Sequence, residues 1–266
     1  MAEPGDGTVG KALGVLDRVA GFGRPVRFAE LLEGSPFPKA TLYRLLQTLT
    51  NQRMLAYDPE RQTYAPGMRL VRLAHTAWAQ SSLAPIARPH VDRLSGMIGE
   101  TVHLAQLDHG QVLYVDKRNA RLPIDMYSQA GKVGPAYCTG VGKAMLAFLP
   151  DPERDRALAQ QSWHRFTNKT RTTPAALIRD LDAIRGRGYA FDDEEHEPGI
   201  ICIAVPVLGA SERVLGALSV TSSTSRTTLA QLETLAPHLT QTARAIASEA
   251  EDWAFPQPAT LNQGGR

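Results

Sequence analysis

The chain has 266 residues, of which 43% are hydrophobic and 21% are charged, and its formal net charge is +2. This composition is that of a globular protein, and the length exceeds the usual single domain of roughly 100 to 200 residues, so we expect two domains. No apolar run reaches the roughly 18 residues of a membrane span, and the first residues lack the basic and apolar regions of a signal peptide. We therefore expect a cytoplasmic protein that does not bind a membrane.

Residues 1–80 carry 10 Lys and Arg and 7 Asp and Glu, a net charge of +3, which leaves −1 for residues 81–266. Within the first segment, residues Lys11–Val19 have amphipathic helical spacing that ends near Gly21, and Phe28–Leu32 form a second short amphipathic stretch. A third helix after a short turn would complete a helix-turn-helix, in which the last helix enters the major groove of DNA.

That third helix is predicted over residues Pro38–Leu49, because proline fits the first helical turn, where its missing N–H leaves no bond unmade. Four leucines recur at i, i+3, i+4 and i+7 and so share one inward face. They are Leu42, Leu45, Leu46 and Leu49. The outward face and flanks have no acidic residue and carry side chains that read base edges or reach phosphates. The predicted DNA contacts are Lys39, Ala40, Thr41, Tyr43, Arg44 and Gln47. An ordinary amphipathic surface helix is the alternative that this segment alone leaves open.

A β-hairpin is predicted directly after the third helix. Residues Met54–Tyr57 and Gln62–Ala65 are typical of short strands, and a tight turn separates them. The hairpin would form the wing of a winged helix-turn-helix and bring Arg61, Gln62 and Tyr64 towards phosphates or the minor groove.

The DNA-binding domain is therefore assigned to residues 1–66, and residues 67–80 are predicted to form a linker helix. Its apolar residues occupy more than one face, so the helix needs a surface to pack against. Either the same helix of a second subunit or the C-terminal domain could provide that surface. A dimer would suit DNA recognition, since paired recognition helices bind half-sites about one helical turn apart.

The C-terminal domain, residues 81–250, alternates hairpin-like strands with helices, which predicts an α+β fold with an antiparallel sheet and flanking helices. A DHG turn joins the first two strands. The predicted strands are 101–107, 111–116, 124–128, 189–192, 200–207 and 214–221. The predicted helices are 83–96, 142–149, 151–159, 174–187 and 227–249. Residues 251–266 are predicted to be a disordered tail.

An enzyme is the rival class. Cys202 with His103 or His196 could form a nucleophile and base, although Cys202 lies in an apolar strand that favours a buried, inert thiol. The other cysteine, Cys138, is likewise read as a small buried apolar residue. The spacing of the histidines and cysteines fits no metal-ligand pattern, and we expect neither a metal nor a cofactor.

Four segments of the C-terminal domain resemble the IclR family of bacterial transcription regulators. These are GPAYCTGVGKAMLAFLP at Gly134–Pro150, DDEEHEPGIICIAVPV at Asp192–Val207, LGALSVTSSTSR at Leu215–Arg226 and ETVHLAQLDHGQVLYVDK at Glu100–Lys117. With the winged helix, the resemblance spans nearly the whole chain. It implies a homodimer or tetramer that binds operator DNA, represses a catabolic operon, and has a GAF-like effector-binding C-terminal domain.

The resemblance also implies a pocket for a small organic acid: a sugar acid, an aromatic acid or a 2-oxo acid. Its residues, carried over by motif, are Gly140, Val141, Asp192, Cys202, Ser219 and Thr221. The first two would open a helix, whose free N–H groups and dipole favour a carboxylate. The last two lie two residues apart on a strand, so their hydroxyls face the same side. Solvated polar residues on one strand face are the alternative.

Overall fold

A computed structural model describes residues 7–81 and 83–251, and the chain divides into two compact units, residues 1–80 and 81–266. Among the helices of these described residues, none combines the length and the apolar character that crossing a bilayer requires. The predicted tail lies outside the described residues, apart from residue 251.

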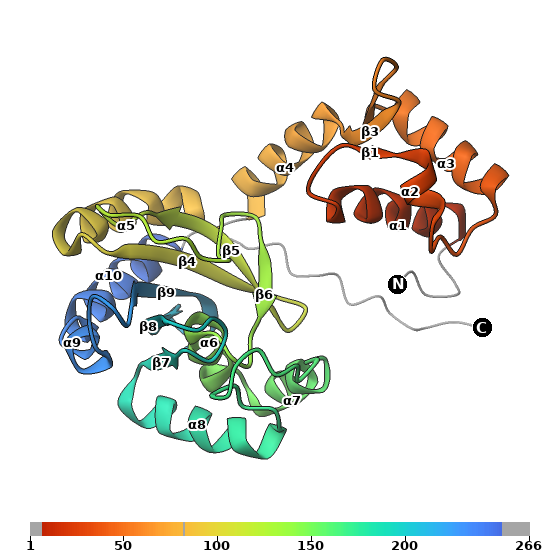
Figure 1. The fold of residues 1–266 in the computed structure, drawn as a ribbon. Coiled ribbons are helices and arrows are strands. Elements are labelled where there is room, and N and C mark those ends of the chain that lie inside the picture. Colours follow the sequence, from red (N-terminus) through yellow and green to blue (C-terminus); the bar gives the residue numbers. More distant parts are fainter. Residues whose placement is uncertain (1–6, 82, 252–266) are drawn as a thin grey trace, which may run out of the picture. The chain divides into compact units, whose positions relative to one another are not determined.

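The described part of the N-terminal unit, which starts at residue 7, contains four helices (Figure 1). They are α1 (Gly7–Gly21), α2 (Phe28–Leu32), α3 (Lys39–Asn51) and α4 (Met68–Ser81). The four leucines of α3 are all buried, in a core shared with Val15, Leu16 and Val19 of α1. The predicted inward stripe of α3 is therefore confirmed, and burial of each leucine stabilises the unit by roughly 1.5 to 3 kcal/mol.

The predicted hairpin is present as β2 (Leu55–Asp58) and β3 (Thr63–Pro66), which pair antiparallel. A two-residue strand that the sequence did not reveal, β1 (Val26–Arg27), pairs with the other side of β3. The prediction for Tyr64 was wrong, because its side chain is only 7% exposed and belongs to the core rather than to the outer face of the wing. Its side chain belongs to the same hydrophobic core as Val15, Leu16 and Val19 of α1, the helix that packs against β3.

The linker helix α4 has an apolar surface that the single chain leaves open. Met68, Val71 and Leu73 are 73%, 58% and 50% exposed. These exposed apolar residues lie on more than one face of the helix and need a covering surface, as the sequence predicted.

The C-terminal unit is built on a six-stranded antiparallel sheet with the order β6-β5-β4-β9-β8-β7. Its strands are β4 (Thr101–Asp108), β5 (Gln111–Arg118), β6 (Val133–Pro135), β7 (Ala190–Asp193), β8 (Ile200–Leu208) and β9 (Val214–Ser223). Helices α5 (Ala84–Ile98) and α10 (Ala236–Glu249) pack together on one face of the sheet, and α6 (Gly140–Phe148) crosses the other face (Figure 1). The remaining helices are α7 (Asp151–Ala159), α8 (Pro174–Arg187) and α9 (Leu229–Glu233). The predicted α+β class is confirmed.

The predicted DHG turn also agrees with the structure. β4 and β5 are joined by His109 and Gly110, whose φ angles are 46° and 75°. Positive φ at both central positions is the requirement of a two-residue type I′ hairpin turn, and glycine meets it without strain.

Two predicted elements were wrong. Residues 124–128 form a loop rather than a strand, because their backbone is held by side chains: Tyr127 N–H donates to the Glu197 carboxylate and Lys117 Nζ donates to the Ser128 carbonyl. The single helix predicted over 227–249 is broken into α9 and α10. Pro237 accounts for the break, since it fits the first turn of α10 but has no N–H to continue a helix from α9.

Candidate functional site

The exposed face of α3 presents most of the predicted DNA contacts. Lys39, Ala40, Tyr43, Arg44 and Gln47 are exposed, and Thr41 is half-buried. Gln47 Nε2 donates to the Tyr43 hydroxyl at 3.2 Å. On the wing, Arg61 and Gln62 are both exposed. The structure thus leaves the polar groups of α3 and the wing tip accessible to a nucleic acid.

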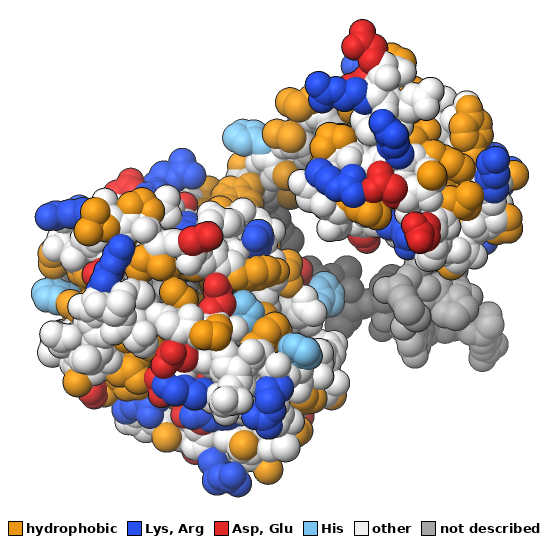
Figure 2. All heavy atoms as spheres, in the orientation of Figure 1, with side chains coloured by type: hydrophobic (Ala, Val, Ile, Leu, Met, Phe, Trp, Pro, Cys, Tyr) orange, Lys and Arg blue, Asp and Glu red, His pale blue; other side chains and the backbone are white. Residues whose placement is uncertain are grey.

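Residues 1–80 carry a net charge of only +3. Figure 2 shows that, on the face in view, its Lys and Arg side chains are interspersed with acidic and apolar ones. Bulk attraction to phosphate is therefore modest, and recognition has to depend on individual side chains at the protein surface.

The six predicted pocket residues all line one cavity in the C-terminal unit. They come from three separate regions of the sequence: the start of α6, strands β7 and β8, and strand β9. Eight further residues line the same cavity and were not assigned to it from the sequence. They are His103, Tyr114, Met126, Ser128, Thr139, His196, Glu197 and Ile200.

Strand register explains why these side chains meet. In one cross-strand row, His103 on β4 is paired with Ser219 on β9, which is paired with Ala204 on β8. In the next row, Thr221 on β9 is paired with Cys202 on β8, which is paired with Asp192 on β7. Directly paired residues point to the same face of a sheet. The polar members of the two rows thus form the cavity floor.

Alanines on the same sheet face allow α6 to approach closely. Ala105, Ala190, Ala204 and Ala217 are all buried in the core that α6 shares with the sheet. A Cβ at Gly140, the first residue of α6, would lie only 2.4 Å from Cys202 Sγ. A glycine is therefore required for the helix to start directly over the cavity floor.

The N-terminus of α6 has no side-chain cap. Thr139 occupies the N-cap position, but its Oγ1 donates to the Pro135 carbonyl at 2.7 Å, and the first N–H groups of the helix receive no capping bond from it. The opening N–H groups of a helix have no partner within the helix and carry its positive dipole end. Since Gly140 and Val141 line the cavity, these groups form a site suited to an anion.

Asp192 is buried at the cavity floor, and its Oδ1 accepts from the Glu195 N–H at 2.8 Å. Burial raises the pKa of Asp192 to about 7, with the nearby Glu195 carboxylate as the second cause. Its charge is thus poised to be neutralised near physiological pH, which would reduce the repulsion between Asp192 and a bound carboxylate.

The chemistry of a cysteine enzyme is not supported by the environment of the thiols. Burial is the main cause that raises the pKa of both Cys138 and Cys202, and the negative charge of Asp192 adds to it. A nucleophilic cysteine needs the opposite environment, one that favours the thiolate. Across residues 7–81 and 83–251, no group of three or more His, Cys, Asp or Glu side chains is placed to hold a metal ion.

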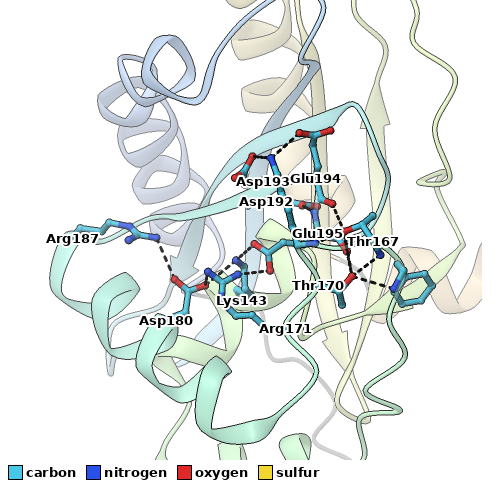
Figure 3. Close-up of polar contacts among 12 residues, drawn as sticks. Lys143, Thr167, Thr170, Arg171, Asp180, Arg187, Asp192, Asp193, Glu194 and Glu195 are labelled. Carbon is cyan, nitrogen blue, oxygen red and sulfur yellow. Dashed lines mark hydrogen bonds and ion pairs between the residues drawn. The ribbon is translucent and has the colours of Figure 1, made fainter.

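A buried cluster of charges holds the acidic loop beside the cavity. Lys143 of α6 is 1% exposed, donates to Asp180 of α8 at 2.9 Å, and also contacts Glu195 in the loop after β7 (Figure 3). Arg171 pairs with Glu195 at 2.6 Å. This ion cluster of Lys143, Arg171, Asp180 and Glu195 fixes the loop that supplies His196 and Glu197 to the cavity.

Sequence reasoning missed several lining residues because their signals were weak. His103 was seen, but a lone histidine without a ligand pattern is more often structural. Pairing between β4 and β9, which places His103 opposite Ser219, was the missing information. Met126 and Ser128 lie in the segment wrongly predicted as a strand, so nothing in the sequence indicated that they line a cavity.

The winged helix-turn-helix and the separate sheet domain with a cavity that polar side chains help to line define the class of this protein. It is a DNA-binding transcription regulator with a C-terminal effector domain. Comparisons with known proteins extend this. The model of the IclR helix-turn-helix domain matches residues 8–59, and the model described as the bacterial transcriptional regulator IclR C-terminal matches residues 75–248. The chain belongs to the IclR family.

Three related proteins illustrate the match. The HTH-type transcriptional regulator XynR of Escherichia coli K12 is 32% identical over 239 residues, which cover 90% of this chain and 95% of that protein. The crystal structure of Thermotoga maritima IclR is similar with a TM-score of 0.73 at 28% identity, covering 92% of this chain and 98% of that one. An IclR homologue from Microbacterium hydrocarbonoxydans, solved with 4-hydroxybenzoate, shares the fold with a TM-score of 0.74 at 22% identity, covering 90% and 98%. The family is non-enzymatic, which sets aside the cysteine enzyme.

Proposed function

We propose that the chain is a ligand-responsive repressor of a catabolic operon, acts as a homodimer or tetramer in the cytoplasm, and binds a small organic acid in the cavity of its C-terminal unit. The observation that carries the proposal is the uncapped N-terminus of α6, which opens into a cavity floored by polar side chains. A carboxylate placed at Gly140 and Val141 would accept from the opening N–H groups of α6 and interact favourably with the helix dipole.

The small volume of the cavity supports a coupling between ligand binding and the conformation of the residues that line it. Only about 30 Å³ of it is open to the centre of a water molecule, which is room for about one or two waters. An organic acid can enter only if the surrounding residues move, and the loop that contributes Met126 and Ser128 is one part of the lining that has no regular secondary structure. A ligand that binds the opened arrangement better than the closed one shifts the equilibrium between them.

The partner for DNA recognition is a second copy of the chain. The exposed apolar residues of α4 supply a surface that an identical helix would cover in part. Two subunits would present two copies of α3, and ligand binding would change the spacing of these helices and hence the affinity for an operator.

The DNA part of the proposal is tested with Arg44→Ala, assayed for binding to a mapped operator and to unrelated DNA. If Arg44 reads a base, specific binding weakens by about 1 to 3 kcal/mol and unrelated DNA is affected much less. Lys169→Ala, an equal charge change on the C-terminal unit, is the control and should leave binding unchanged. Equal binding of the Arg44 variant and the wild type would remove Arg44 from this role.

The ligand part is tested by a thermal-shift screen of sugar acids, aromatic acids and 2-oxo acids, because a ligand that binds only the native state raises its stability. The double variant Ser219→Ala/Thr221→Ala should lose the response to an acid that stabilises the wild type, while its operator binding is retained. A double variant that still responds with wild-type affinity would refute the assignment of these hydroxyls to the site.

A further inference from the structure

The charged side chains that line the cavity have one sign. They are the carboxylates of Asp192 and Glu197, and neither Lys nor Arg occurs among the described residues of the lining. The basic side chains of the lining are two histidines, His103 and His196. Attraction for an anion therefore has to come from the histidines, from cations outside the lining, or from the N-terminus of α6.

The two histidines add no positive charge that a ligand could use. Burial lowers the pKa of His103 to about 3, and the positive charge of Lys117 contributes to the same shift, so this ring is neutral at physiological pH. The Nδ1 atom of His196 lies 3.7 Å from the Glu197 carboxylate. A proton on His196 would therefore be compensated within the protein.

Glu197 stays ionised at physiological pH. Burial by itself would raise its pKa, but hydrogen bonds from His196 and from the Tyr127 N–H outweigh burial, and the pKa lies below its ordinary value. The Tyr127 N–H donates to both carboxylate oxygens, at 3.0 and 3.1 Å. The lining thus keeps a negative charge even when Asp192 is protonated.

The cations just outside the lining already have partners. The ion cluster contains two cations and two carboxylates, which compensate one another. Lys117 Nζ donates to the Ser128 carbonyl at 2.7 Å, and its charge interacts favourably with that of Glu197. These positive charges are therefore balanced before a ligand binds.

The remaining attraction suits one carboxylate. The opening N–H groups of a helix carry the equivalent of roughly half a positive charge, and those of α6 can hydrogen-bond one carboxylate. A second ionised group on the same ligand would leave water for a small cavity that already contains Asp192 and Glu197. Burial of a charge without a partner is costly, and repulsion between like charges adds to the cost.

We propose that this cavity selects acids with a single negative charge and rejects dianions, and that Asp192 and Glu197 are the residues that set this preference. The inference rests on the function proposed above and narrows its class of ligand. Monocarboxylic sugar acids, aromatic acids and 2-oxo acids remain candidates. Their dicarboxylic and phosphorylated counterparts are excluded.

The test is isothermal titration calorimetry of the full-length protein at pH 8, where Asp192 has lost its proton. Three pairs of acids of similar size differ by one charge: gluconate and glucarate, 4-carbamoylbenzoate and terephthalate, and 2-oxopentanoate and 2-oxoglutarate. In every pair with a member that binds, the monoanion should bind about 10-fold or more tightly than the dianion, since like charges brought together at a binding site cost at least this much.

A double variant tests the two carboxylates. Asp192→Asn/Glu197→Gln removes both charges and keeps the shapes of the side chains, including an oxygen that can accept from the Tyr127 N–H. The preference for the monoanion should fall by about 3-fold or more, because the dianion is relieved of repulsion at both its ends. Asp193→Asn is the matched control. It removes the same charge from the adjacent residue, which pairs with Lys169 at 2.9 Å outside the cavity lining, and should keep the wild-type preference.

Each contrary outcome has a distinct meaning. A dianion that binds the wild type as tightly as its monoanionic partner would overturn the inference and leave the proposed acid-binding function standing. If none of the six acids binds, both are overturned. A preference that persists in the double variant, or that is lost in Asp193→Asn, would overturn the assignment to Asp192 and Glu197. If the double variant does not fold, as judged by its thermal unfolding, the wild-type ratios and Glu197→Gln alone still decide the question.

Discussion

The close approach of α6 to the sheet gives a sharp prediction for Gly140→Ala. The new Cβ would lie 2.4 Å from Cys202 Sγ, whereas its next neighbours, Ala204 Cβ and Asp192 N, would be at 3.4 and 3.5 Å, near ordinary contact. One clash therefore dominates. Overpacking a core costs about 1 to 3 kcal/mol, and we expect about 1 to 2 kcal/mol here because Sγ can rotate.

The clash is removable, which allows a double-mutant cycle. In the Cys202→Ala background the sulfur is absent, so the remaining contacts of the Gly140→Ala methyl group are normal and its cost should fall close to zero. The coupling free energy between the two sites is then about 1 to 2 kcal/mol in the favourable direction, within the range measured for contacting residues.

Gly142→Ala is the matched control. Its Cβ would lie 2.4 Å from the backbone Cα and O of Ala136, so no side-chain truncation at Cys202 relieves it. The free energy of unfolding is measured in urea on the full-length chain, with Trp163 fluorescence as the probe after Trp78 and Trp253 are replaced by Phe. The losses of unfolding free energy in Gly140→Ala and Cys202→Ala are summed and compared with the loss in the double variant. If the two agree within about 0.5 kcal/mol, the claim that Sγ limits the approach of α6 is refuted.

Three further outcomes follow from the structure. Leu46→Ala should lower the free energy of unfolding of the N-terminal unit by about 2 to 5 kcal/mol, because the leucine is fully buried, while the exposed Gln47→Ala should leave thermal unfolding unchanged. Lys143→Met removes a positive charge that compensates the buried carboxylates of Asp180 and Glu195, and it should lower the free energy of unfolding in urea by about 3 to 5 kcal/mol. A loss smaller than that of the exposed Lys169→Ala would contradict the role of the ion cluster. The affinity for an acid should fall as the pH rises through about 7, because Asp192 loses its proton there and repels the carboxylate; calorimetry between pH 6 and pH 8 should show this for the wild type and a flat profile for Asp192→Asn.

The DNA-binding unit was largely predictable because its signals are local. The leucine stripe of α3 and the hairpin after it depend on spacing within a few residues, and both are present. Tyr64 was misplaced because alternation along a strand shows that two faces exist, but which face is covered depends on α1, far away in the sequence.

The cavity was predictable only through resemblance. The family motifs predicted that Asp192, Cys202, Ser219 and Thr221 lie together. The pairing register of β7, β8 and β9 in the structure explains why they do. His103 could not be assigned in the same way, since its partners are more than a hundred residues distant in sequence on β9. The loop over residues 124–128 was equally hidden, because a strand and a loop held by remote side chains have the same apolar alternation.

The sheet face beneath α6 carries two groups of residues with different roles. This separation bears on how the ligand of such a protein can change in evolution. The alanines at positions 105, 190, 204 and 217 determine how closely the helix approaches, while positions 103, 202, 219 and 221 face the cavity. Except at Cys202, where the helix start touches the sulfur, substitutions in the second group can alter what is bound without moving the helix. New effectors can therefore be acquired by exchanging a few side chains at one end of a surface whose other end keeps the fold intact.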